Sequence, residues 1–184
     1  MPIVISSLAD MPDLVRNFGV RDLVSVIHPE AQPRTPSEID PARHHRCAVH
    51  DIVQPSPGKI SPQTKDIEAL IKFLDTWDSE VPLLVHCLAG VSRSTAVGLI
   101  AHTLKTGDPR KSAMALRKAS PYAWPNRRIL ALADSILGLD GELTKAREAM
   151  GPASWEANPN YVAPRLQGQR AAGYQLQRFT TLHV

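Results

Sequence analysis

Short apolar runs in the first half of the chain predict buried strands. Residues 2–7, 23–27 and 81–85 are almost continuous hydrophobic runs, and residues 46–50 form a fourth candidate strand. Runs of this length, bounded by Pro, Gly and polar residues, are typical of strands inside a sheet. The first half of the chain is therefore expected to supply the central sheet.

Helical patterns alternate with these strands and then dominate. Ser61-Pro62 is a helix start, with Ser as the N-cap and Pro at the first helical position, and apolar residues follow at helical spacing. Strands that alternate with helices, followed by several helices, predict an α/β domain: a central sheet flanked by helices, with a helical C-terminal half. The expected helices cover residues 10–18, 62–74, 94–105, 109–119, 126–139 and 141–150.

The periodic pattern weakens after residue 150, where Pro and Gly recur. We therefore expect one domain over residues 1–150 and a C-terminal tail over residues 151–184 that packs on the domain or is partly mobile. A chain of 184 residues with 43% hydrophobic and 21% charged residues is large and apolar enough to form a core, and is not disordered.

Charge and hydropathy narrow the set of partners. A formal net charge of +3 fits an anionic ligand, but also an ordinary basic protein, and Lys and Arg form no stripe, so nucleic acid is not expected. No apolar run approaches the length of a membrane span, and the N-terminus does not resemble a signal peptide. Two cysteines do not make a disulfide framework, so we expect a cytoplasmic protein without a membrane partner.

The connection between the run at 81–85 and the next helix carries the candidate chemistry. It contains His86, Cys87, Gly90, Arg93 and Ser94, and Gly90 supplies the freedom for a sharp turn. Inward-pointing amides of such a loop and the positive end of the helix dipole form an anion site sized for phosphate, where a sulfate would also fit. The expected phosphate-binding residues are Leu88, Ala89, Gly90, Val91, Ser92 and Arg93.

The side chains of this loop predict nucleophilic catalysis. Cys87 faces the anion site, where the positive surroundings stabilise a thiolate. Arg93 has a planar fork that suits two phosphate oxygens, and the Ser94 hydroxyl could donate to the sulfur as it leaves. The alternative is that Cys87 is a small buried apolar residue. The joint register of Cys, Gly, Arg and Ser on one strand–loop–helix unit favours the catalytic interpretation.

The Cys-x5-Arg-Ser pattern, preceded by Val85-His86, resembles the signature of the protein tyrosine phosphatase superfamily. Ala89-Gly90 and the run at 92–95 are similar to the dual-specificity-like branch, and the resemblance extends over residues 46–132. It implies a phosphatase-like fold and phosphomonoester hydrolysis through a phosphocysteine intermediate, with no cofactor and no metal. His86 is expected to support the loop.

The resemblance also implies a general acid, an Asp on a loop well before the Cys. Asp51 directly follows a predicted strand and opens a loop rich in Pro and Gly. The chain departs from many members here, because Val49-His50 stands where they have Trp-Pro. The alternative role for Asp51 is to cap the loop. Asn126, after Pro125, resembles a residue that braces the signature loop and caps the following helix.

Two alternatives concern Cys47. His44, Cys47 and His50 suggest a metal site, but strand alternation sends Cys47 to the face opposite His44 and His50, so a core role is favoured. In some members of the superfamily a second Cys forms a reversible disulfide with the nucleophile, and Cys47 could pair with Cys87 in this way.

The expected activity is therefore hydrolysis of a phosphotyrosine or dual-specificity protein substrate, or of a small phosphomonoester. Alternatives are a phosphatase of a non-protein substrate (a phosphoinositide, RNA or nucleotide) and a non-catalytic module that binds phosphorylated residues. The loop carries no charge between Cys87 and Arg93, which disfavours a multiply charged inositol lipid. Tyr122 and Trp124 are candidates for the aromatic wall of a phosphotyrosine pocket, with core packing as the alternative.

Overall fold

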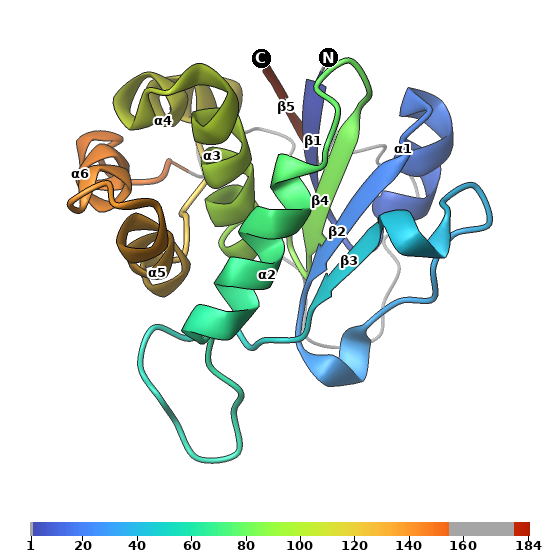
Figure 1. The fold of residues 1–184 in the computed structure, drawn as a ribbon, viewed down its shortest axis with the longest axis horizontal. Helices are drawn as coiled ribbons and strands as arrows, with labels where there is room; N and C mark the ends of the chain where they lie inside the picture. The colour runs from blue at the N-terminus through green and yellow to red at the C-terminus, as the bar shows by residue number, and fades with distance from the viewer. Residues whose placement is uncertain (1, 155–178) are drawn as a thin grey trace.

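A computed structural model describes residues 2–154 and 179–184, and its centre is a five-stranded sheet (Figure 1). The strand order is β3-β2-β4-β1-β5. The first four strands are parallel, and β5 runs antiparallel to β1. The expected α/β class is confirmed. The strands are β1 (Pro2–Ser7), β2 (Asp22–Val26), β3 (His44–Cys47), β4 (Leu83–Cys87) and β5 (Phe179–His183).

Helices cover the two faces of this sheet unequally. Figure 1 shows α1 on one face and the other helices on the opposite face. None of the described helices is long and apolar enough to cross a membrane. The helices are α1 (Met11–Phe18), α2 (Thr64–Asp75), α3 (Arg93–Thr106), α4 (Pro109–Ala119), α5 (Arg127–Leu137) and α6 (Glu142–Ala149), with single 3-10 turns at Pro29–Ala31 and Pro41–Arg43.

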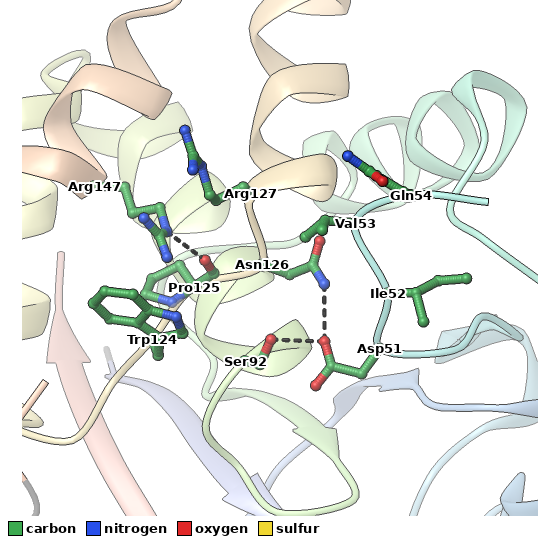
Figure 2. A pocket seen from close by; sticks show the side chains of 10 residues that line it. All are labelled: Asp51, Ile52, Val53, Gln54, Ser92, Trp124, Pro125, Asn126, Arg127 and Arg147. Carbon is green, nitrogen blue, oxygen red and sulfur yellow. Dashed lines mark hydrogen bonds between the residues drawn. The ribbon is translucent and has the colours of Figure 1, made fainter. Parts of the chain in front are cut away.

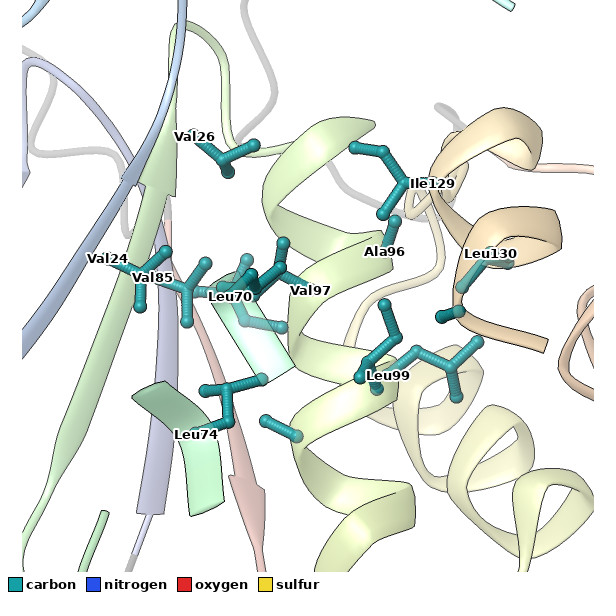
Figure 3. Close-up of a cluster of buried hydrophobic side chains, with 14 of the residues drawn as sticks. Val24, Val26, Leu70, Leu74, Val85, Ala96, Val97, Leu99, Ile129 and Leu130 are labelled. Atoms are coloured by element: carbon teal, nitrogen blue, oxygen red, sulfur yellow. The ribbon is translucent and has the colours of Figure 1, made fainter. Parts of the chain in front are cut away.

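Alternation along the strands builds two separate cores. Val4, Leu23 and Leu84 pack with apolar residues of α1. Val24 and Val85 point the other way, into the larger core with α2, α3 and α5 that Figure 3 shows. This alternation is what a sheet with helices on both faces requires.

The central helix α3 is buried on nearly all sides, from Arg93 to Thr103. Gly98 lets it lie close to β1, because a Cβ at this position would overlap the Cδ1 atom of Ile5. The N-terminus of α3 is thereby held beside the ends of the inner strands β1 and β4.

Most expected elements are present, and two boundaries differ. The third strand covers His44–Cys47 rather than residues 46–50, because the chain turns out of the sheet where the Val49 amide donates to the Cys47 carbonyl. Helix α2 begins at Thr64 rather than at Pro62. Gln63 is its N-cap and forms a capping box with Asp66, so Ser61 is not the cap.

The last strand, β5, was not expected from the sequence. Residues 155–178 of the predicted tail lie outside the described residues, but Phe179–His183 pairs with β1 along its whole length. Leu182 is 2% exposed and belongs to the larger core. On α3, the His102 ring donates from Nε2 to the His183 carbonyl at 3.1 Å, and its Nδ1 lies 2.8 Å from the Ser112 hydroxyl on α4. Strand β5 is thus part of the same sheet as the four parallel strands.

We predict that Leu182→Ala lowers the free energy of unfolding by about 2–5 kcal/mol, the usual cost of such a truncation in a core. Val184 is 40% exposed, so Val184→Ala is the matched control and should change stability very little. Urea unfolding of both variants measures the difference. Equal stability of the two variants would show that β5 does not contribute to the folded domain.

Candidate active site

A sharp turn joins the end of β4 to the start of α3, and we call it the 87–93 loop. Gly90 in this loop has φ of 76°, in the left-handed region that favours glycine. A Cβ at this position would lie 2.8 Å from the carbonyl carbon of Ser6 in β1. Both the conformation and the space therefore require glycine, as the sequence predicted for this turn.

Cys87 is the last residue of β4 and is 2% exposed. Its Sγ accepts a hydrogen bond from the Gly90 amide at 3.3 Å and lies 3.2 Å from the Ser94 Oγ. The sulfur thus has a backbone amide and a hydroxyl group as its polar neighbours. The structure brings Cys87 and Ser94 together, as the sequence predicted.

Arg93 is the first residue of α3 and is almost fully buried. Its Nη1 donates to the Val49 carbonyl at 2.8 Å, and its Nε has no hydrogen-bond partner among the described residues. A buried charged group with an unused donor is costly unless it pairs with an opposite charge. Arg93 is therefore suited to hold an anion at the 87–93 loop.

Asp51 reaches this loop from the other side of the site. Its Oδ1 accepts hydrogen bonds from the Ser92 Oγ at 2.7 Å and the Asn126 Nδ2 at 2.8 Å (Figure 2). Its Oδ2 lies 3.9 Å from the Arg93 Nε, and the side chain is 39% exposed. The structure thus places Asp51, Arg93 and Ser92 in one group, although Asp51 is far from the loop in sequence.

Asn126 contacts both the start of α5 and the 87–93 loop, the two places where the resemblance expected it. Its side-chain oxygen accepts from the amides of Arg128 and Ile129 and so caps α5. Its side-chain nitrogen donates to Asp51, and its own amide donates to the Ser92 carbonyl at 3.2 Å. Asn126 therefore braces the loop and positions the carboxylate at once.

The segment that begins at Asp51 leaves the body of the domain as an exposed loop, the 51–60 loop, seen below α2 in Figure 1. Two hydrogen bonds close its base: the His50 amide donates to the Ile60 carbonyl at 2.7 Å, and the Ile60 amide donates to the His50 Nδ1 at 3.0 Å. Asp51 directly follows this closure, which holds it at the site although the rest of the loop extends into solvent.

A buried chain of polar side chains lies beneath the nucleophile. The His86 Nε2 is 2.6 Å from the Ser25 Oγ, which is 2.7 Å from the His44 Nε2, and the His44 Nδ1 is 2.9 Å from the Thr35 Oγ1. The chain crosses β4, β2 and β3 on the face that α1 covers. Sequence reasoning singled out His86 but missed Ser25 and Thr35, because the lateral order of the strands was needed to place them side by side.

The two histidines of this polar network, His44 and His86, are neutral at physiological pH. Burial lowers the pKa of His86 to about 4, and burial together with the charge of Arg46 lowers the pKa of His44 to about 4. A neutral imidazole has one donor and one acceptor nitrogen, so Ser25 can donate to one ring and accept from the other.

The structure separates the residues considered for a metal site. His44 bonds to Ser25 on the α1 face, whereas Cys47 packs in the larger core on the opposite face, where burial raises its pKa to about 12. Within residues 2–154 and 179–184, no three His, Cys, Asp or Glu side chains are grouped so that they could bind a metal ion.

A Cys47–Cys87 disulfide does not fit the sheet. Cys47 pairs with Val26, and the register of β2 with β4 places Cys87 on the other side of Val26. Two strand spacings separate the Cα atoms by about 10 Å, beyond the reach of a disulfide without backbone movement. Both thiols are free.

A cavity of about 590 Å³ adjoins Asp51 and Ser92, and we call it the side cavity (Figure 2). Its walls are the start of the 51–60 loop and the segment 124–127, with Arg147 of α6 behind them. Of the two aromatic candidates, Trp124 lines this cavity and is 45% exposed, whereas Tyr122 is buried near Thr180 of β5. Sequence reasoning did not find Arg147.

The chain superimposes on solved structures of dual-specificity and tyrosine phosphatases. No known family model and no curated protein matches the chain. DUSP15 superimposes with a TM-score of 0.53 at 21% identity, over 79% of this chain and 88% of that one. Human DUSP28 has a TM-score of 0.53 at 20% identity, with 80% and 89% covered. PTPMT1 in complex with PI(5)P has a TM-score of 0.52 at 14% identity, with 79% and 88% covered.

These similarities establish the fold. The resemblance to the dual-specificity-like branch that the signature implied is confirmed at that level. In this fold the 87–93 loop carries Cys87 and Arg93, and Asp51 approaches Arg93 from the start of the 51–60 loop.

We predict that acid weakens the domain through the buried histidines. The folded-state pKa of His44 and of His86 lies below the ordinary value of 6.5, so the unfolded chain binds protons first as the pH falls. The free energy of unfolding should not depend on these two groups above pH 6.5 and should fall between pH 6.5 and 4. Each unit of pKa difference corresponds to about 1.4 kcal/mol.

Urea unfolding of His44→Gln at a series of pH values checks this prediction. The variant lacks one of the two titrating groups, so its stability should depend less steeply on pH in that range. His183→Gln replaces an exposed imidazole and is the matched control, with the wild-type slope expected. An unchanged slope in His44→Gln would contradict the linkage.

Proposed function

We propose that this protein is a cysteine-dependent phosphatase that hydrolyses phosphomonoesters through a phosphocysteine at Cys87. The observation that carries the proposal is the set of groups at the 87–93 loop. The Cys87 sulfur is contacted by the Gly90 amide and the Ser94 hydroxyl, Arg93 is buried with an unused donor, and the Asp51 carboxylate lies 3.9 Å from that arginine. A thiolate, an anion clamp and an acid are the groups that phosphoryl transfer to a cysteine needs.

In the first step, the Cys87 Sγ attacks phosphorus, the S–P bond forms and the bond to the leaving oxygen breaks. The leaving oxygen takes the proton of Asp51, whose Oδ2 accepts no hydrogen bond within the described residues. Because Oδ1 is fixed by Ser92 and Asn126, the outer oxygen of the carboxyl group is the one that can carry the proton.

In the second step, Asp51 accepts a proton from a water molecule that attacks the phosphocysteine. The S–P bond breaks, and phosphate and the thiolate are released. The Ser94 hydroxyl, 3.2 Å from the Sγ, stabilises the sulfur as it leaves. One carboxyl group thus acts as acid and then as base.

Arg93 would hold the transferred group through its free nitrogens. Nη1 is committed to the Val49 carbonyl, so Nε and Nη2 are the donors left for two phosphate oxygens. The bond to Val49 fixes the guanidinium plane, and little side-chain entropy remains to be lost when the anion binds. The amides of residues 88–93 would cradle the remaining oxygens, and a free phosphate or sulfate would occupy the same site.

For the substrate, we propose a phosphotyrosine or dual-specificity protein. The 87–93 loop has no charged side chain before Arg93, and an exposed aromatic wall, Trp124, stands nearby. PTPMT1 has the same fold and was solved with a phosphoinositide, so an inositol lipid is the second candidate. A reactive thiolate requires reducing surroundings, which supports a cytoplasmic location.

We predict that Cys87→Ser abolishes turnover of p-nitrophenyl phosphate while phosphate binding is retained, because an unactivated hydroxyl is a poor nucleophile. Steady-state kinetics and calorimetric phosphate binding measure the two effects. Cys47→Ala removes the other thiol, which is buried and inert, and should keep the wild-type rate. Normal turnover by Cys87→Ser would overturn the mechanism.

We predict that Asp51→Asn slows hydrolysis of phenyl phosphate by about 10²–10⁴-fold, the usual contribution of a general acid. An activated substrate such as p-nitrophenyl phosphate should lose much less, because its leaving group does not need the proton. The amide keeps an oxygen for Ser92 and Asn126, so the site should stay assembled.

The pH dependence of kcat/KM gives an independent measurement. The basic limb reflects the acid losing its proton and should flatten in Asp51→Asn. Asp75→Asn changes an exposed carboxylate at the end of α2 and serves as the control. Equal losses on both substrates, with the basic limb intact, would assign Asp51 a structural role only.

A further inference from the structure

The side cavity has an aromatic and cationic wall that the catalytic steps do not use. Trp124 is a large apolar side chain with 45% exposure, and the Arg147 guanidinium carbon lies 4.3 Å from the centre of its ring. Figure 2 shows the two side chains stacked at one end of the cavity, away from Asp51. A cation stacked on an indole ring is a favourable and oriented pair.

Arg147 is buried and is held in place through its Nε. It is 7% exposed, and its Nε donates to the Pro125 carbonyl at 2.7 Å. Its terminal nitrogens have no hydrogen-bond partner among the described residues. Burial lowers the pKa of Arg147, and the charge of Arg127 adds to this effect while Glu148 opposes it. Because the pKa is lowered on balance, a further anionic partner would stabilise the positive charge of Arg147.

Arg127 adds a second positive charge at the rim of the same cavity. Its contact with Glu148 is 3.4 Å long, and both side chains are more than half exposed. An exposed pair of this kind contributes little and can be exchanged for another anion. The cavity therefore ends in two arginines, one fixed and one adjustable.

The opposite end of the cavity would not repel an anionic substrate. Asp51 is the one acidic side chain among the described residues that line the cavity, and its Oδ1 is already bonded to Ser92 and Asn126. Its Oδ2 lies 3.9 Å from the Arg93 Nε, so the charge of Asp51 is offset by that guanidinium. The charge that an incoming group meets is then mainly that of the arginines.

The cationic wall is tied directly to the 87–93 loop. The Trp124 amide donates to the Val91 carbonyl at 2.9 Å, and the Asn126 amide donates to the Ser92 carbonyl at 3.2 Å. The distance from the phosphate position to the wall is thus fixed by the backbone. Little conformational entropy of the protein is therefore lost when one ligand occupies both the phosphate position and the side cavity.

We propose that the side cavity is a subsite for an acidic side chain adjacent to the phosphorylated residue of a peptide substrate, with Arg147 and Arg127 binding its carboxylate and Trp124 packing against its stem. This inference rests on the proposed phosphatase function. Ile52, Val53 and Pro125 make the rest of the lining largely apolar, which suits a peptide better than a headgroup charged on all sides.

The test compares pairs of phosphotyrosine peptides that carry Glu or Gln at each flanking position in turn. At one position the wild type should have a higher kcat/KM for the Glu peptide by about tenfold, the effect of one hydrogen bond to a charged group. In Arg147→Gln and in Arg127→Gln this ratio should fall toward one. Trp124→Leu should lower kcat/KM for both peptides and leave the ratio unchanged.

Two controls separate the subsite from folding. Arg110→Gln removes an exposed arginine of α4 outside the cavity and should keep the wild-type ratio. The second control is p-nitrophenyl phosphate, which is too small to reach the wall. Its rate of hydrolysis reports how much intact active site each variant retains, so each peptide rate is divided by the rate on this substrate. Arg147→Lys keeps the charge and should retain part of the preference.

The outcomes distinguish the subsite from the phosphatase itself. If the wild type hydrolyses p-nitrophenyl phosphate but hydrolyses the Glu and Gln peptides of every pair at equal rates, the subsite proposal is overturned. The catalytic proposal would then still stand. A wild type inactive on all substrates would overturn the catalytic proposal, and peptide binding to Cys87→Ser by calorimetry would then decide the subsite alone. Faster hydrolysis of an inositol bisphosphate than of any peptide, lost in Arg147→Gln, would overturn the assignment to a peptide.

Discussion

The contact between Gly90 and the end of β1 is the constraint on which the site depends. A Cβ at Gly90 would lie 2.8 Å from the carbonyl carbon of Ser6, so the loop can turn only where a glycine lies against that strand. The turn directs the Gly90 amide at the Cys87 sulfur and places Arg93 and Ser94 at the start of α3. A second glycine, Gly98, lets the same helix lie close to β1, so two close approaches set the position of the loop relative to the sheet.

The surroundings of the loop are held from two further directions. Segment 124–126 binds the loop carbonyls of Val91 and Ser92 through backbone amides, and the Asn126 side chain carries this support on to Asp51. Asp51 in turn is fixed where the closed base of the 51–60 loop meets the body of the domain. Three segments that are distant in sequence therefore depend on one another. Such an arrangement keeps a carboxylate within reach of a substrate at no ordering cost when the substrate binds.

The polar chain beneath Cys87 places polar side chains inside the sheet, where burial costs free energy unless each group is hydrogen-bonded. His86 and His44 are buried and neutral, and each is satisfied only while Ser25 lies between them. Buried polar groups stabilise a unique structure when every member is bonded and destabilise it when one is not. The polar chain links β4, which ends in the nucleophile, to its neighbour β2 and through β2 to β3, which fixes the register of these three strands.

The local elements of the fold could be predicted from the sequence itself. The apolar runs and the Cys-Gly-Arg-Ser register predicted four of the five described strands, most helices and the turn at Gly90, because each depends on neighbours a few residues away. Tertiary structure alone decided the rest. The strand order placed Ser25 between two histidines and separated Cys47 from Cys87, and β5 required β1 as its partner, since Phe179–His183 carries only a weak strand pattern. Arg147 met Trp124 only through the packing of α6, because a contact between residues far apart in the chain follows from the fold and leaves no local pattern.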